Sequence, residues 1–84
     1  MRRVTLVLAN RIEGRLLSSF SFEEVQLRIN RAIPQARWAY LGYKGNRFCL
    51  DTVVSEGKLP AVEQQARQQP YVKQVLSEPW PARA

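Results

Sequence analysis

The 84-residue sequence predicts an α+β domain in which a four-stranded antiparallel sheet carries two helices on one face. Two observations predict this class: four short runs are rich in β-branched and aromatic residues, and two segments repeat apolar residues at helical spacing. The segments alternate as strand, helix, strand, strand, helix, strand. A chain of this length forms one domain with a modest core, which we place at residues 1–78, with residues 79–84 as an extended C-terminal tail.

The first strand is expected at residues 3–9, RVTLVLA. Its even-numbered apolar residues share the face that packs under the helices, and Thr5 and Val7 lie on the opposite face, because side chains alternate along a strand. The polar residues 10–15 are expected to form a surface loop, alone or leading into a short helical turn at Leu16-Leu17.

A capping box is the clearest local signal for a helix. In Ser21-Phe22-Glu23-Glu24 the first and last side chains can each bond the backbone of the other. Phe20 and Val25 flank this box as a hydrophobic staple. We therefore expect a helix at residues 22–32, which ends before Pro34 because proline cannot continue it.

Residues 38–54, WAYLGYKGNRFCLDTVV, are expected to form a β-hairpin around the two-residue turn Gly45-Asn46. Counting outward from the turn fixes the pairing, because directly opposed residues share a face. One set is core material expected to face the helices: Tyr43 with Phe48, Leu41 with Leu50, and Ala39 with Thr52. The other set is chemically mixed and expected to face outward: Lys44 with Arg47, Gly42 with Cys49, Tyr40 with Asp51, and Trp38 with Val53.

The C-terminal third is expected to add a helix and a strand. Pro60 suits the first turn of a helix, where its missing N–H costs nothing, and the helix ends before Pro70. A strand at residues 71–76 follows. Two flanking prolines keep Trp80 in extended chain, and we expect its ring either to fold back over apolar surface or to dock on a partner.

With right-handed crossovers, these elements most simply form a sheet of order 4-1-3-2, numbered along the chain, with both helices on one face. This arrangement is the ferredoxin-like βαββαβ plait. It leaves the other face of the sheet uncovered. The hairpin register places on that face the residues Trp38, Tyr40, Thr5, Val7, Cys49 and Val53.

A partly apolar open face favours a non-catalytic regulatory or adaptor domain, which associates through this face or its strand edges as a homodimer or with a protein partner. The alternative is a module that binds single-stranded RNA or DNA, with Trp38 and Tyr40 stacking on bases. In that alternative the phosphates are contacted by Arg3, Lys44 and Arg47. The formal net charge of +6 fits acidic partners in general.

Two short segments resemble known families. Lys44-Gly45-Asn46-Arg47-Phe48 resembles the start of the RNP1 peptide of the RNA-recognition motif, and residues 6–10 are similar to its RNP2 peptide. The resemblance implies RNA binding on the sheet, although Asn46 and Val7 stand where that family presents stacking aromatics. Residues 10–14, followed by Leu16-Leu17, are similar to the first loop of ACT regulatory domains, with an extra residue before the glycine.

The residue content argues against an enzyme or a metal site. Cys49 is the single cysteine and the chain has no histidine, so a thiol nucleophile lacks its usual base and zinc lacks its usual ligands. Asp51 near Tyr40 is the one pairing for proton transfer, and a solvated or arginine-paired carboxylate explains Asp51 more simply. We expect no cofactor. We also expect no transmembrane segment, because the apolar run at residues 4–9 is too short to span a membrane. A lone cysteine favours a reducing compartment, so we expect a cytoplasmic location.

Overall fold

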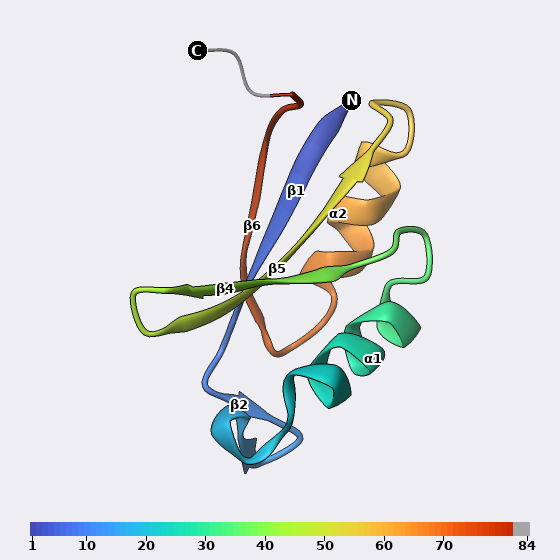
Figure 1. Cartoon of the computed structure of the whole chain (residues 1–84). Coiled ribbons are helices and arrows are strands. Elements are labelled where there is room, and N and C mark those ends of the chain that lie inside the picture. The colour runs from blue at the N-terminus through green and yellow to red at the C-terminus, as the bar shows by residue number, and fades with distance from the viewer. Residues whose placement is uncertain (82–84) are drawn as a thin grey trace.

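The computed structural model describes residues 1–81, which form a sheet layer and a helix layer (Figure 1). The sheet is antiparallel and has the order β4-β5-β1-β6. Its strands are β1 (Arg2–Leu8), β4 (Ala39–Lys44), β5 (Arg47–Val54) and β6 (Val72–Pro79), and the helices are α1 (Phe22–Ala32) and α2 (Leu59–Arg67). Both helices lie on one side of the sheet (Figure 1). The prediction of an α+β domain with a four-stranded antiparallel sheet is confirmed.

The order of elements along the chain is not a plain βαββαβ, because a small hairpin stands between β1 and α1. It consists of β2 (Arg11–Ile12) and β3 (Arg15–Leu16), and the 3-10 turn η1 (Leu17–Ser19) follows. Residues 10–15 thus form a short hairpin where a surface loop was expected, whereas the short helical turn expected at Leu16-Leu17 is found at Leu17–Ser19. Glu13 and Gly14 connect the two short strands with φ values of 53° and 78°, the backbone of a tight two-residue hairpin turn.

The start of α1 confirms the predicted capping box. The hydroxyl of Ser21 accepts a hydrogen bond from the Glu24 N–H at 3.1 Å, and the Glu24 carboxylate accepts from the Ser21 N–H at 3.2 Å. Phe20 and Val25, the two residues of the predicted staple, are both buried. Local sequence alone thus determines where this helix begins, since every partner lies within five residues.

The β4–β5 hairpin departs from the predicted pairing at one residue. Tyr43 faces Phe48 and Gly42 faces Cys49 as expected, but Tyr40 faces Leu50, so Leu41 is an extra residue in β4. Gly42 beside it has a φ of +128°, which a residue with a side chain rarely adopts. Such a β-bulge shifts everything beyond it by one position, and a shift of one residue moves each side chain to the other face.

The bulge moves two aromatic residues from the open face to the helix side. Trp38 is fully buried in the core, and Tyr40 shares the face of Leu50. The predicted outward placement of Trp38 and Tyr40 is therefore wrong. Burying the Trp38 side chain, at about 200 Å² and about 25 cal/mol per Å², is worth about 5 kcal/mol, which exceeds the cost of roughly 1–3 kcal/mol for one unpaired ladder position.

Helix α1 replaces the ladder partner that Trp38 lacks. The Trp38 N–H donates to the side-chain oxygen of Asn30 at 2.7 Å, and the Trp38 carbonyl accepts from the side chains of Asn30 and Gln26 at 3.2 and 3.0 Å. The indole N–H donates to the Ile33 carbonyl at 3.3 Å. All the polar groups of this buried residue are thereby satisfied, as burial requires.

Strand β6 is longer than the expected residues 71–76 and includes Pro79, which lies opposite Arg2. The Trp80 N–H donates to the Met1 carbonyl at 3.0 Å, so the start of the predicted extended tail is tied to the first residue of the chain. The last part of that tail, residues 82–84, lies outside the described residues.

We predict that Trp38→Ala lowers the free energy of unfolding by about 3–5 kcal/mol, the usual cost of deleting a large aromatic side chain from a core. Denaturant unfolding measures it. Leu27→Ala is the control, because Leu27 is 57% exposed on α1, and its effect should stay within about 0.5 kcal/mol. Similar unfolding midpoints for both variants would mean that Trp38 is not in the core.

The capping box also predicts a pH dependence of stability. The backbone N–H and then the hydroxyl of Ser21 hold the pKa of the Glu24 carboxyl below its ordinary value of 4.5. A lowered pKa in the folded state stabilises the fold above the unfolded value and loses that effect as the pH falls through the folded value. The stability difference between wild type and Glu24→Gln should therefore be largest above pH 4.5 and shrink in more acidic solution. A pH-independent difference contradicts this role of the carboxylate.

Candidate functional site: the open face of the sheet

The face of the sheet opposite the helices is the candidate site, and we call it the open face. Its residues follow from the strand pairing, because Thr5 lies between Asp51 and Leu76, and Val7 lies between Cys49 and Gln74. The open face consists of Arg3, Thr5 and Val7 in β1, Ala39, Gly42 and Lys44 in β4, Arg47, Cys49, Asp51 and Val53 in β5, Gln74, Leu76 and Glu78 in β6, and the ring of Trp80.

A charge network of one cation and two carboxylates occupies one end of the open face. The Arg3 guanidinium lies 3.0 Å from the Asp51 carboxylate and 3.5 Å from the Glu78 carboxylate. It also lies 5.5 Å from the centre of the Trp80 ring, within the range of a cation–π contact. Arg3 was predicted as a phosphate contact, and the structure instead places it between two carboxylates on the same chain.

Aliphatic side chains fill the middle of the open face. Val7 and Val53 are half-buried, whereas Leu76 is 45% exposed. Thr5 and Cys49 lie between them and are nearly inaccessible. Of the predicted open-face residues, Thr5, Val7, Cys49 and Val53 are thus brought together as expected. Leu76 was missed, although the period-2 pattern of the last strand contained the signal.

The basic end of the open face lies at the hairpin turn. Lys44 and Arg47 are directly opposed on β4 and β5, as predicted. The RNP1-like segment therefore forms the tip of the hairpin, and Phe48 within it points inward and is only 1% exposed. Neither cation takes part in an ion pair within residues 1–81, so this end of the face is positively charged.

Displaced Tyr40 joins Phe22, Tyr43 and Phe48 in a cluster on the helix side, which we call the aromatic cluster. Phe22 and Tyr40 stack with ring centres 4.5 Å apart and planes 12° from parallel. Phe48 contacts both rings and meets Tyr43 edge-on at 5.6 Å. Phe22 and Tyr43 remain about half exposed, at 49% and 52%. The sequence contained a signal for this cluster in Gly42, because a glycine inside a strand often marks a bulge.

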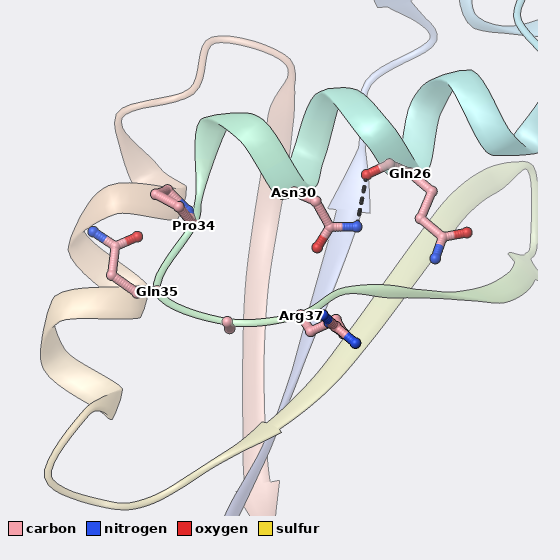
Figure 2. A pocket seen from close by; sticks show the side chains of 6 residues that line it. Gln26, Asn30, Pro34, Gln35 and Arg37 are labelled. Atoms are coloured by element: carbon pink, nitrogen blue, oxygen red, sulfur yellow. Dashed lines mark hydrogen bonds between the residues drawn. The ribbon is translucent and has the colours of Figure 1, made fainter.

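A wide surface pocket of about 610 Å³ lies between the end of α1 and the segment before β4 (Figure 2). Its lining includes Gln26 and Asn30, whose side chains reach from α1 toward this segment (Figure 2). Both amides are already engaged with the backbone of Trp38, and Asn30 also donates to the Gln26 carbonyl at 3.0 Å. We therefore assign these amides to holding Trp38 in the core.

The groups whose pKa is displaced do not lie on the open face. Glu24 and Tyr71, whose pKa values are displaced, both lie elsewhere, and the pKa of Tyr71 is raised because burial disfavours the phenolate. Residues 1–81 contain no group of three or more carboxylate and thiol side chains placed to hold a metal ion. Among the described helices none has the length and apolar character needed to cross a bilayer.

Comparison with protein-family models, curated proteins and solved structures finds no match for this chain. The short similarities to the RNA-recognition motif and to ACT domains thus gain no support from these comparisons. The function of this chain must therefore be inferred from its own surfaces, and two surfaces have a distinctive composition. The open face combines aliphatic residues with paired charges, and the aromatic cluster presents exposed rings.

We predict that the Cys49 thiol reacts with a disulfide reagent only when the protein unfolds, although it lies on the face without helices. Cys49 is fully buried, and its sulfur lies 3.6 Å from the Arg47 carbonyl. The rate of thiol labelling under native conditions should rise with denaturant in step with unfolding. Fast labelling in native buffer would mean that the centre of the open face is accessible.

Proposed function

We propose that this chain is a non-catalytic domain that associates with a second copy of itself through the open face. The observation that carries the proposal is the exposed Leu76, which lies diagonally from half-buried Val7 across the β6–β1 pair, with half-buried Val53 on the same face. Neither α1 nor α2 covers this face (Figure 1). Apolar side chains gathered on one face mark interaction surfaces more often than single exposed residues do. The paired charges of Arg3, Asp51 and Glu78 fit the same use, since ions that are already paired are cheaper to cover than a lone ion.

The distribution of charge on the open face favours a second copy as the partner. Lys44 and Arg47 lie at the hairpin end, and Glu78, whose side chain is 51% exposed, lies toward the opposite end of the sheet. A two-fold axis that lies in the plane between two facing copies, at right angles to the line that joins these two ends, brings each end against the opposite end of the other copy, because a two-fold interface is self-complementary. The basic end of one protomer then lies over the acidic end of its partner.

Single-stranded RNA or DNA fits the open face less well than a protein does. That alternative rested on Trp38 and Tyr40 as stacking residues and on Arg3 as a phosphate contact. Trp38 is buried, Tyr40 lies on the helix side, and the Arg3 guanidinium is bound to carboxylates. The face retains Trp80 and the cations of the hairpin end, which are few for a nucleic-acid platform.

We also propose that the fold is a ferredoxin-like plait to which hairpin β2–β3 has been added. The sheet order and the two helices on one side support this view. An association module of this kind needs no catalytic residue, cofactor or metal. Its activity would lie in the assembly that it forms, whether it acts as a regulatory or an adaptor domain.

The test is the solution mass of the protein, measured by light scattering and sedimentation from low to high micromolar concentration. Wild type should approach twice the 9.7 kDa mass of the chain. Leu76→Lys should weaken association about tenfold or more, because it places a charge in the apolar centre of the interface. Leu27→Lys is the matched control, since it makes the same change at a residue that is 57% exposed on α1, and it should leave association unchanged.

A charge exchange tests the two-fold arrangement itself. Arg47→Glu should weaken association, and adding Glu78→Arg in the same chain should restore part of it, because each copy then again presents opposite charges at its two ends. A wild-type monomer at high concentration, or equal effects of Leu76→Lys and Leu27→Lys, would overturn self-association through this face. If a different protein binds the monomer, and Leu76→Lys weakens that binding, then the open face is the binding site but its partner is that protein and not a second copy of the chain.

A further inference from the structure

A small pocket lies where the tip of the β4–β5 hairpin meets the segment between β1 and α1, and we call it the tip pocket. Its volume is about 240 Å³. It is lined by Asn10, Leu16, Leu17, Ser18, Tyr43 and Asn46. The lining thus joins apolar surface, one aromatic ring and short polar side chains, the combination that small-ligand sites use for packing and orientation.

Tyr43 is the residue that gives the tip pocket its chemistry. Its ring is 52% exposed and makes a T-shaped contact with Phe48, at 5.6 Å between ring centres and 83° between planes. A T-shaped contact leaves at least one flat face of the Tyr43 ring unoccupied by Phe48, which a planar ligand can contact. Leu16 is 51% exposed beside it, so a flat apolar group is favoured over an extended polar one.

Each stretch of the lining has a cation as its neighbour in the chain. Arg11 follows Asn10, Arg15 precedes Leu16, Lys44 follows Tyr43 and Arg47 follows Asn46. Of these four cations none forms an ion pair within residues 1–81, and the one acid on hairpin β2–β3, Glu13, is bound to Arg28. The tips of hairpins β2–β3 and β4–β5 that line the pocket are therefore positively charged, with Lys44 and Arg47 on the open-face side of the β4–β5 tip, and they complement an anionic ligand.

A flat ring inside and anionic groups outside are the two parts of a nucleotide. We infer that the tip pocket binds one base of a single-stranded nucleic acid, stacked on Tyr43, with the neighbouring phosphates on the cations of the two hairpin tips. The volume fits this view, because clefts that enclose whole small ligands measure about 300–1,000 Å³, and this pocket is smaller. Asn10, Ser18 and Asn46 are exposed and carry the groups that hydrogen-bond base edges.

The aromatic cluster extends the same surface. Tyr43 contacts Phe48, which contacts the stacked pair of Phe22 and Tyr40, and Tyr40 is 37% exposed. The exposed rings of Phe22 and Tyr40 thus add aromatic surface near Tyr43, on which further bases can stack whatever their identity. Tyr43 lies on the helix side of the sheet, so the contact with the base does not depend on association through the open face. Lys44 and Arg47 lie on the open face, so their phosphate contacts do.

The test is fluorescence anisotropy with a short labelled oligouridine and its DNA counterpart, between about 50 and 200 mM salt. Wild type should bind, with an affinity that falls as salt rises. Tyr43→Ala should weaken binding about 5- to 100-fold, the range for one stacked base, with the same salt slope. Tyr43→Phe keeps the stacking ring and should bind like wild type, which separates stacking from a structural role.

Removing cations should change a different quantity. Lys44→Gln with Arg47→Gln should reduce the salt slope, by about 0.7 for each phosphate of the single strand that no longer meets a cation. Lys58→Gln with Lys73→Gln is the matched control, because it removes the same charge from residues outside both hairpin tips. Equal effects of the two double variants would mean binding by net charge alone, and would overturn the assignment.

Two competitors complete the test. Double-stranded RNA should compete poorly, since a stacked base cannot enter the pocket. If uridine monophosphate displaces the oligonucleotide, the pocket also binds the free nucleotide. If uridine monophosphate does not displace it, the site is specific for a strand. In both cases the base stacks on Tyr43. Absence of binding at the lowest salt, or an unchanged affinity in Tyr43→Ala, would overturn the inference.

Discussion

The extra residue in β4 determines which chemistry each face of the sheet presents. Between Tyr40 and Gly42 the hairpin gains one residue, and everything beyond the bulge changes sides. The core gains the Trp38 side chain, and the amides of Asn30 and Gln26 supply the hydrogen bonds that the sheet no longer offers to its backbone. The bulge is therefore favoured because burying the Trp38 side chain outweighs the loss of one ladder position in the sheet. Side chains of α1 also form hydrogen bonds with the Trp38 backbone groups that the sheet no longer pairs.

The same shift separates two surfaces with different chemistry. Without the bulge, the large aromatic rings and the paired charges would share the open face. With it, the open face keeps aliphatic residues and the Arg3 network, while Tyr40 joins Phe22 on the helix side. An aliphatic face with charges of opposite sign at its two ends suits another protein surface, and exposed rings beside unpaired cations suit bases and phosphates. One residue of register thus places Trp38 and Tyr40 on the helix side and leaves the open face aliphatic.

Elements encoded by local sequence could be predicted, and elements decided by tertiary packing could not. The start of α1 follows from Ser21 and Glu24, and the hairpin turn follows from Gly45-Asn46, because all the groups concerned are neighbours in the chain. The bulge depends on a core that includes α1, which no local pattern describes. Gly42 was its only local sign. Thr5, Val7, Cys49 and Val53 were placed correctly because β1 and β5 pair without a shift between them. Hairpin β2–β3 was missed because strands of two residues show no periodicity, although Gly14 marked its turn.

The two proposed surfaces share Lys44 and Arg47, and this sharing couples them. In the two-fold arrangement these cations face the partner's carboxylates, whereas in the tip pocket they face phosphates. A cation that already pairs with a carboxylate gains less from a phosphate, and the coupling must be equal in both directions, because linkage between two binding equilibria is reciprocal. Nucleic acid would then favour the monomer, and association would weaken nucleic-acid binding. The apolar contribution of Leu76 and the stacking contribution of Tyr43 lie outside this competition, since each serves only one of the two partners.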